Sequence, residues 1–362
     1  MPEGVVIRSP VRRVLISRQN PAARYPASMR IFITGAAGFI GFHLAARLLA
    51  DGHAVVGVDG MTSYYDVRLK AARYSLLDAY DSFSGHTVML EDMGELAALA
   101  RQQHPEAIIH LAAQAGVRYS LENPRAYVDA NLVGTFNVME LAKEFAVRHL
   151  MVASTSSVYG ANSAIPFAET DRADHPMTLY AATKKAIEEM THAYSHLWEI
   201  PTTAMRFFTV FGPWGRPDMA LFKFVDAMLK DQPIDVYNHG KMERDFTYID
   251  DLVEAVTRLA DKPPERNSPV AGATDSLSPV APWRAVNVGG GRPTDLMDFI
   301  AAIEIALGRK ARLNLLPMQA GDVPTTFADT TLLTALTDYR PDTSVEAGVA
   351  AFCDWYKTHY GL

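Results

Sequence analysis

Cysteine, long apolar runs and metal-binding spacings are all scarce in this 362-residue sequence. Its single cysteine, Cys353, cannot form an internal disulfide. No apolar stretch approaches the roughly 18 residues needed to cross a bilayer, and the eleven histidines show no spacing typical of a metal site. These absences exclude disulfide-stapled, membrane-spanning and zinc-binding classes. We therefore expect a globular cytoplasmic protein without a metal.

Positive charge is also in short supply outside the first 28 residues. Residues 1–28 hold five arginines against one acid, Glu3, whereas the whole chain carries a net charge of −7. Because the remainder is therefore acidic, we expect no nucleic-acid partner. The basic leader lacks the apolar segment of a secretory signal, although its composition loosely resembles a transit peptide. We interpret residues 1–28 as an overlong start or a disordered leader before Met29, with targeting as the alternative.

Short apolar runs alternate with helical patterns from Met29 onward. The runs predicted as strands are "RIFITG", "AVVGVD", "TVMLED", "AIIHLA", "HLMVAS" and "TTAMRF". This alternation predicts an α/β fold, a doubly wound parallel sheet covered by helices on both faces. Beyond about residue 206 the pattern becomes irregular, which predicts a smaller C-terminal α/β lobe over 206–362. The later run "AVNVGG" could return to the first sheet, and residues 261–283, rich in Pro, Ser and Ala, predict a surface insertion.

Glycines punctuate the end of the first predicted strand in "TGAAGFIG", at Gly35, Gly38 and Gly41. Glycines there let the backbone turn sharply and approach a pyrophosphate, which the positive end of the following helix stabilises. Alone, the pattern could reflect close packing of helix on strand. Asp59 ends the second strand, where a carboxylate can bind an adenosine ribose and repel a 2′-phosphate, and no arginine follows before Arg68. The sequence predicts a Rossmann-type domain over 29–205 that binds NAD rather than NADP.

Other polar residues near strand ends have two interpretations. Asp92, at the end of the predicted third strand, could accept a hydrogen bond from the adenine amino group or cap the helix that follows. Asp250 and Asp251 are interpreted as N-caps of the helix "LVEAVTRLAD" rather than as ligands. His110 is interpreted as a hydrogen-bonded residue at a strand end.

The segment "YAATK" places Tyr180 and Lys184 four residues apart, on one face of a predicted helix. An ammonium beside a phenol stabilises the phenolate, so this spacing predicts a tyrosine of lowered pKa that acts as a general base. Thr155, in the hydroxyl-rich strand end "VASTSSVYG", can donate to the same substrate oxygen. A second match, Tyr237 and Lys241, lies in a glycine-containing polar stretch that is not expected to be helical.

The glycine turn, "STSSVYG" and "YAATK", in this order, identify the chain as a member of the extended short-chain dehydrogenase/reductase family. Within that family it resembles the UDP-glucuronate 4-epimerases over residues 29–362. The longer matching stretches are "YYDVRLK", "HLAAQAGVRYSLENPRAYVDANLVGT", "RFFTVFGPWGRPDMAL", "RDFTYIDD" and "LPMQAGDVPTTFADT". One departure is Gly60, where relatives commonly carry Asn, which puts one adenosine contact in doubt.

The resemblance implies a role for each matching residue. It makes Tyr180 the base, Thr155 its hydroxyl partner, Lys184 a ligand of the nicotinamide ribose, and Asn131 a support for that lysine. The implied NAD contacts are Gly35, Gly38, Phe39, Ile40, Gly41, Asp59, Asp92, Leu111, Ala112, Ala113, Asn131, Ser154, Tyr180 and Lys184. The implied UDP-sugar contacts are Arg118, Thr155, Ser156, Ser157, Thr209, Arg216, Arg244 and Asp322.

The hydroxyl cluster separates the branches of this family. Sugar-nucleotide dehydratases carry Asp-Glu where this chain has Ser156 and Ser157, and decarboxylating UDP-xylose synthases carry Glu at the second position. Oxidising glucuronate at carbon 4 creates a β-keto acid that readily loses carbon dioxide. Our hypothesis is that Ser156, Ser157 and Thr209 hold the carboxylate in an unreactive orientation, because neutral hydroxyls add no catalytic acid. Alternatively, the serines only cap neighbouring backbone amides.

The activity implied by the resemblance is reversible 4-epimerisation of UDP-glucuronate to UDP-galacturonate, through transient oxidation at carbon 4 by tightly bound NAD. A UDP-glucuronate decarboxylase, a neutral UDP-hexose 4-epimerase and a dinucleotide-sensing binding protein are the alternatives. The resemblance also implies a homodimer, since "NLVGTFNVMELAKEF" and "YAATKKAIEEMTHAYSHL" have faces that could pair across a two-fold axis. Burial against the protein's own sheet explains those faces equally well.

Overall fold

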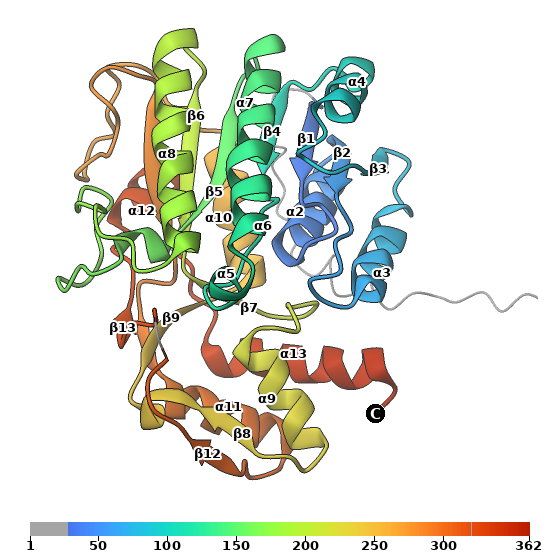
Figure 1. Cartoon of the computed structure of the whole chain (residues 1–362), viewed down its shortest axis with the longest axis vertical. Helices are drawn as coiled ribbons and strands as arrows, with labels where there is room; N and C mark the ends of the chain where they lie inside the picture. Colours follow the sequence, from blue (N-terminus) through green and yellow to red (C-terminus); the bar gives the residue numbers. More distant parts are fainter. Residues whose placement is uncertain (1–27, 320) are drawn as a thin grey trace, which may run out of the picture.

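A parallel sheet of seven strands forms the centre of the computed structural model, which describes residues 28–319 and 321–362 (Figure 1). The leader proposed over residues 1–28 therefore lies almost entirely outside the described residues. The strand order is β10-β6-β5-β4-β1-β2-β3. The strands are β1 (Arg30–Thr34), β2 (Ala54–Asp59), β3 (Phe83–Thr87), β4 (Ala107–His110), β5 (Leu150–Thr155), β6 (Thr202–Phe207) and β10 (Trp283–Val288). The predicted α/β fold with a parallel sheet is confirmed.

Alternate residues of the central strands point into two different apolar cores. Ile31 and Ile33 of β1 pack in one core, whereas Phe32 packs in the other. The first core is covered by α2 (Phe39–Ala50), α3 (Val67–Leu77), α10 (Ile249–Ala260) and α12 (Thr331–Thr337). The second core is covered by α4 (Met93–Gln103), α7 (Gly134–Glu144) and α8 (Leu179–Trp198). The apolar strands are continuous because both faces of the sheet are buried.

The third strand was predicted wrongly. The apolar run "TVMLED" meets β3 only at Thr87, because the strand comprises Phe83–Thr87, "FSGHT". β3 lies at the edge of the sheet and is largely exposed, so burial does not require apolar side chains there. The apolar run follows the strand instead, and its Leu90 is buried in the core beneath α4 and α7.

A smaller lobe lies against the carboxyl ends of the large sheet (Figure 1). Its small sheets contain β7 (Thr209–Phe211), β8 (Ile234–Val236), β9 (Glu243–Tyr248), β11 (Pro293–Asp295), β12 (Leu313–Leu315) and β13 (Thr325–Thr326). Its helices are α9 (Ala220–Leu229), α11 (Leu296–Leu307) and α13 (Val345–Tyr360), which share a third apolar core.

The two lobes are interleaved along the chain. The expected boundary at 205/206 falls inside β6, and β10 pairs in parallel with β6 after the chain has already passed through the smaller lobe. The expected return of "AVNVGG" to the first sheet is therefore confirmed. The stretch before β10, which was predicted as an insertion, is irregular over 262–282.

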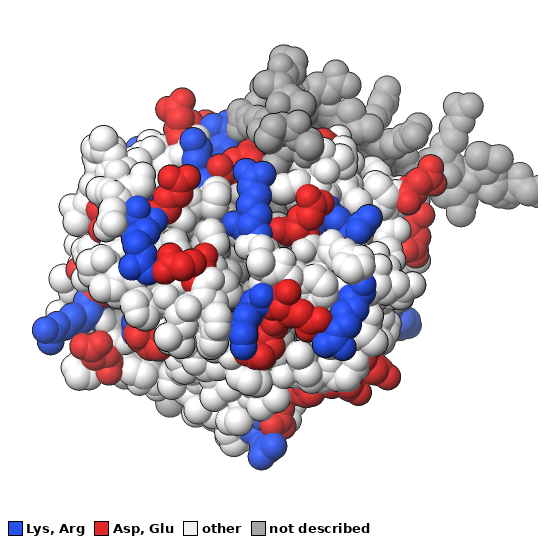
Figure 2. Space-filling model, turned by 90° about the horizontal axis from the view of Figure 1, so that it is seen from above, with Lys and Arg blue, Asp and Glu red and all other residues white. Residues whose placement is uncertain are grey.

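Charged side chains of both signs lie on the surface. On the face in Figure 2, basic side chains lie among acidic ones, so the described part of this face presents no concentrated positive field. Among the helices in 28–319 and 321–362, none is long and apolar enough to cross a membrane. The same part of the chain holds no cluster of His, Cys, Asp and Glu side chains arranged to bind a metal ion.

Candidate active site

A cavity of about 980 Å³ lies between the carboxyl ends of the strands and the smaller lobe. It opens where the strand order reverses between β4 and β1, which is the usual ligand position in doubly wound sheets. Of the residues that the sequence analysis assigned to cofactor or substrate, all except Asp92 and Asn131 line this cavity. Residues from both lobes are therefore brought together, although Gly35 and Asp322 are almost 300 positions apart.

The glycine turn forms one wall and leaves no room for side chains. A Cβ atom at Gly35 would lie 2.7 Å from the backbone nitrogen of Ala112, and one at Gly41 would lie 2.1 Å from the carbonyl oxygen of Gly35. Gly35 also has a φ of +74°, which favours glycine. α2 begins directly after this turn, so its free amide groups point toward the cavity. This backbone cradle fits the pyrophosphate of a dinucleotide such as NAD.

Asp59 lies at the end of β2, as predicted, and has a cationic neighbour that the sequence analysis missed. Its Oδ1 accepts hydrogen bonds from the Met61 amide at 2.8 Å and from the Lys70 ammonium at 3.4 Å. Both charged side chains are about nine-tenths buried. The sequence-based prediction considered only arginines as cations near Asp59. The cation found there is a lysine, Lys70, which reaches Asp59 from the first turn of α3. Asp59 is thus fixed in place where a ribose would bind.

Asp92 and Asn131 hold local structure outside the cavity lining. The Asp92 carboxylate accepts from the Glu95 amide and caps α4, so the N-cap interpretation is the one found. Asn131 lies in a π-helical turn, η1 (Val128–Val133), and is fully buried. It bonds the backbone of Gln114 at 2.8 and 3.1 Å and the Thr183 hydroxyl at 3.1 Å. It therefore supports the loop after β4 and the start of α8 without bonding Lys184.

Tyr180, Thr155 and Lys184 come together as predicted at the end of β5 and the start of α8. The Lys184 ammonium donates to the carbonyl oxygen of Ala153 at 2.9 Å, which ties α8 to β5. Burial raises the pKa of Tyr180, and a hydrogen bond with Thr155 and the positive charge of Arg216 oppose that rise. The expected lowering of the Tyr180 pKa is not seen, because burial outweighs the Thr155 hydrogen bond and the Arg216 charge. Burial lowers the pKa of Lys184 itself to about 8.

The hydroxyl-rich segment both caps a turn and lines the cavity. The Thr155 hydroxyl accepts from the Ser157 amide at 3.2 Å, which starts the short helix η2 (Ser156–Tyr159). The Thr155 side chain also lies 3.3 Å from the Ser157 hydroxyl, and Ser156 lines the same wall. The cap therefore comes from Thr155 rather than from a serine, and Ser156 and Ser157 line the cavity, so their role in holding a carboxylate stays a prediction.

Ser154 belongs to a buried network behind that wall. Its hydroxyl donates to Glu188 at 2.6 Å, and Glu188 forms a buried ion pair with Arg206 at 2.9 Å. Arg206 also donates to the Tyr159 hydroxyl at 3.0 Å. The network joins β5, β6 and α8, so it fixes the strand end that carries Thr155 relative to the helix that carries Tyr180. Sequence analysis missed Glu188, although it follows Lys184 by one helical turn.

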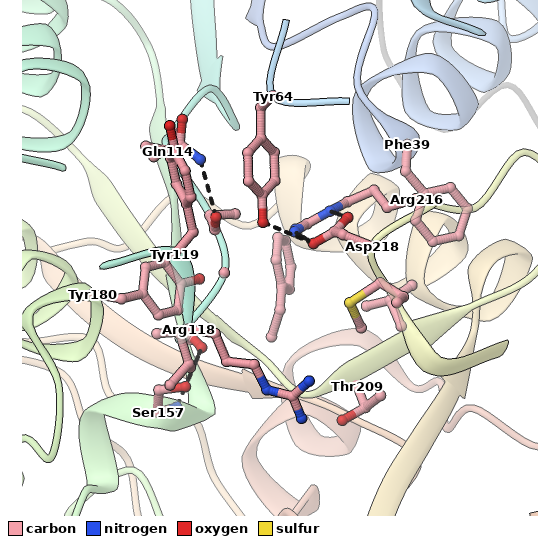
Figure 3. A pocket seen from close by; sticks show the side chains of 18 of the residues that line it. Phe39, Tyr64, Gln114, Arg118, Tyr119, Ser157, Tyr180, Thr209, Arg216 and Asp218 are labelled. Carbon is pink, nitrogen blue, oxygen red and sulfur yellow. Dashed lines mark hydrogen bonds and ion pairs between the residues drawn. The ribbon is translucent and has the colours of Figure 1, made fainter. Parts of the chain in front are cut away.

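The arginines on the opposite side are already paired with carboxylates. Arg216 forms two bonds to Asp218, at 3.0 and 2.5 Å, and the Tyr64 hydroxyl donates to the same carboxylate at 3.1 Å (Figure 3). Arg244 pairs with Asp322 at 3.0 Å. Sequence analysis proposed three of these residues and missed Asp218 and Tyr64.

Arg118 lies over the ring of Tyr237, 4.5 Å from its centroid. Tyr237 opens the short turn η3 (Tyr237–Gly240), whose residues 238 and 239 are not helical, in agreement with the prediction that this tyrosine is outside a regular helix. It nevertheless lines the cavity, which the sequence analysis missed. In Figure 3 the Arg118 side chain reaches between Ser157 and Thr209.

Two remaining expectations have opposite outcomes. His110 is satisfied at its strand end, 2.7 Å from the Thr34 hydroxyl and 2.9 Å from the Thr135 hydroxyl, as predicted. Asp250 and Asp251 are not N-caps, because α10 already begins at Ile249. Asp251 instead accepts from the Thr343 amide at 2.8 Å, which anchors the segment before α13.

Residues 31–271 match the NAD dependent epimerase/dehydratase family. A probable UDP-glucuronate 4-epimerase of Rhizobium meliloti (strain 1021) is 62% identical over 334 residues, covering 92% of this chain and 98% of that protein. UDP-glucuronate 4-epimerase 1 of Arabidopsis thaliana is 42% identical and covers 91% of this chain and 77% of its own length. The crystal structure of UDP-glucuronic acid 4-epimerase from Bacillus cereus, in complex with UDP-glucuronic acid and NAD, superposes with a TM-score of 0.81 at 31% identity, covering 92% of this chain and 100% of that one. On sequence and fold alike, the chain belongs to the NAD dependent epimerase/dehydratase family.

Proposed function

We propose that the protein interconverts UDP-glucuronate and UDP-galacturonate by 4-epimerisation, using tightly held NAD. The observation that carries this proposal is the set of side chains on the cavity wall between the glycine turn and the Arg216–Asp218 and Arg244–Asp322 pairs. There Tyr180 and Thr155 adjoin Ser156 and Ser157, neutral hydroxyls where dehydration needs acidic side chains. The 62% identity to a probable UDP-glucuronate 4-epimerase supports the same activity.

Tyr180 is the proposed base for the 4-hydroxyl of the sugar. As phenolate it takes the hydroxyl proton directly or through Thr155, and the Arg216 charge and the Thr155 hydroxyl favour that phenolate against the effect of burial. Lys184, held by the Ala153 carbonyl, is placed to bind the nicotinamide ribose. When bound in the glycine cradle, NAD would supply reversible hydride transfer, by accepting the hydride from carbon 4 and returning it afterwards.

Carboxylate recognition is assigned to the hydroxyls of Ser156, Ser157 and Thr209. Figure 3 shows Ser157 and Thr209 on different sides of the cavity, with the Arg118 side chain reaching between them. We infer that these hydroxyls fix the carboxylate so that the keto intermediate keeps its carbon dioxide. In Ser157→Ala or Thr209→Val we expect weaker substrate binding or release of a UDP-pentose. If both variants kept wild-type affinity and gave no pentose, this assignment would be wrong.

Proton NMR of the purified protein with UDP-glucuronate, and without added NAD, tests the proposal. Growth of UDP-galacturonate toward an equilibrium mixture is the expected result. Appearance of a UDP-pentose would instead indicate the decarboxylase. If UDP-glucuronate stayed unchanged while UDP-glucose or its N-acetyl derivative epimerised, the neutral-hexose alternative would hold. Loss of turnover with every UDP-sugar, despite bound NAD, would leave a dinucleotide-binding protein.

A homodimer through α7 and α8 is the assembly that we propose. The two helices stand side by side on the outside of the large sheet (Figure 1). They expose apolar side chains, among them Phe136, Leu197 and Trp198, which are 45%, 64% and 41% exposed. Sedimentation velocity of wild type and of Leu197→Glu tests this interface, and a monomer in both samples would exclude it. We also propose a cytoplasmic location, in keeping with the unpaired, buried Cys353, and cell fractionation tests it.

A further inference from the structure

α3 carries two buried cations on one face. Lys70 and Arg73 are three residues apart and both are buried, with Leu69 and Leu77 on the same side. The Lys70 ammonium donates to Asp59, which ends β2 at the expected ribose position. Arg73 is fully buried and bonds a different set of residues from Lys70. A buried guanidinium is costly unless its donors are satisfied, so its partners indicate what it is for.

The partners of Arg73 are uncharged oxygens from three segments. Nη1 donates to the carbonyl oxygen of Ala37 at 2.8 Å and to the hydroxyl of Tyr65 at 2.9 Å. Nη2 donates to the carbonyl oxygens of Trp214 and Gly215 at 2.6 and 3.4 Å. Three of these four partners are backbone carbonyl oxygens and none is a carboxylate, so the side chain fixes the positions of backbone segments rather than neutralising a charge.

These segments belong to the two halves of the cavity. Ala37 lies inside the glycine turn that fits the dinucleotide pyrophosphate. Trp214 and Gly215 directly precede Arg216, which is paired with Asp218 and faces the substrate side. Arg73 is therefore a direct link between the cofactor turn and the loop that carries a proposed substrate arginine.

The linked loop needs such support. Trp214 has a φ of +60°, a left-handed conformation that is strained for a bulky residue and persists only when its surroundings hold it. His43 of α2 gives a second anchor, with Nε2 2.9 Å from the Pro213 carbonyl. The glycine turn, by contrast, is fixed by its own backbone. If the link is lost, the loop rather than the turn is the part that moves.

We propose that Arg73 is a positioning residue that sets the place of Arg216 relative to the bound cofactor, and so controls affinity for the UDP-sugar. This inference rests on the proposed function and on the contact with the UDP-sugar that the family resemblance implies for Arg216. It assigns to Arg73 an effect on substrate binding at a distance, without contact to substrate. A purely structural arginine would instead affect folding and both ligands together.

The first test compares Arg73→Met and Arg73→Lys with two control variants. Arg68→Met removes an exposed arginine from the same helix, and Arg284→Met removes a buried arginine that pairs with Asp275 away from the cavity. We expect both Arg73 variants to bind UDP at least ~tenfold more weakly by calorimetry, and to raise the KM for UDP-glucuronate similarly, with unchanged NAD content. The controls should match wild type in both. Unchanged UDP affinity in folded Arg73→Lys would overturn the proposal, as would NAD loss in proportion to a fall in Tm.

A double-mutant cycle then asks whether Arg73 acts through Arg216. If it does, Arg73→Lys should weaken UDP binding by less than about threefold in an Arg216→Lys background, because the coupled group is already lost. Full multiplicative effects of the two substitutions would contradict the link. UDP binding does not depend on turnover, so this result stands even if wild type fails to epimerise UDP-glucuronate. That failure would refute the proposed function alone.

Discussion

The cofactor half and the substrate half of the cavity are lined by different parts of the chain. The cofactor half is made of backbone, in a turn where a Cβ atom at Gly41 would lie 2.1 Å from another residue's carbonyl oxygen. The substrate half is made of side chains, among them two arginines held by carboxylates in the Arg216–Asp218 and Arg244–Asp322 pairs. A backbone site tolerates almost no change of residue, whereas a paired arginine can be moved or weakened in small steps. The first half thus fixes one cofactor, and the second adjusts affinity.

The largest effect is expected in the backbone half. Gly41→Ala places a methyl group against the carbonyl oxygen of Gly35, so the turn cannot keep its shape. We expect purified Gly41→Ala to retain no NAD and to show no turnover, measured by cofactor release on denaturation and by NMR. Gly94→Ala is the control, since its nearest contact would be 3.3 Å, to the Asp92 carboxylate. NAD retention in Gly41→Ala would show that the turn is not the cradle.

Tyr180→Phe tests the point where the halves meet. Loss of the phenol removes the proposed base while leaving the glycine turn intact, so turnover should fall by at least ~10³-fold with NAD content unchanged. Tyr74→Phe, at a partly buried tyrosine that does not line the cavity, serves as the control. Near-normal rates in Tyr180→Phe would reject the catalytic assignment.

Smaller, graded effects on UDP affinity are expected in the substrate half of the cavity. If Arg244 binds the diphosphate, as the resemblance implies, Arg244→Ala should weaken UDP binding by ~10-fold or more, because charge-assisted donors are lost. Asp322→Asn removes the competing carboxylate and leaves Arg244 in place, so its effect should be smaller. Calorimetry of both variants, with the exposed Arg312→Ala as control, measures the difference. Equal losses in Arg244→Ala and Asp322→Asn would mean that the pair acts as one unit.

The smallest effect is expected behind the cavity, at Glu169. Burial raises the pKa of this carboxyl from 4.5 to about 7, while its Oε1 accepts from the Asn287 amide at 2.8 Å. The folded protein then binds a proton more tightly than the unfolded chain, so stability falls as pH rises from about 4.5 to 7. Glu169→Gln avoids that loss, and its Tm relative to wild type should be a few degrees higher at pH 8 than at pH 4.5. A difference that does not change with pH would contradict the titration.

The contrast between the halves also explains what the sequence could predict. The glycine turn, Asp59 and the Tyr180–Lys184 pair lie in short segments with fixed spacing, so their place at strand ends and on one helix face follows from local pattern. The edge strand β3 was missed because exposure removes its apolar signature.

Side chains that meet across the fold were beyond prediction. The Tyr64–Asp218 bond joins residues 154 positions apart, and the Arg73–Trp214 bond joins residues 141 apart. Each depends on how a helix or loop packs on a distant one, which no periodicity within a segment encodes. Lys70 could have been found, because it follows Asp59 by only 11 residues.

The late arrival of β10 in the large sheet has a consequence for synthesis. β6 is fully buried in the finished protein, but the strand that covers its outer edge ends at Val288, some 80 residues further along the chain. During translation, β6 therefore presents an unpaired strand edge, open to pairing with other chains, until β10 has been made. A chain that terminates within that interval keeps an unpaired strand edge and is prone to aggregate. Slow elongation there lengthens the time for which a chaperone is needed.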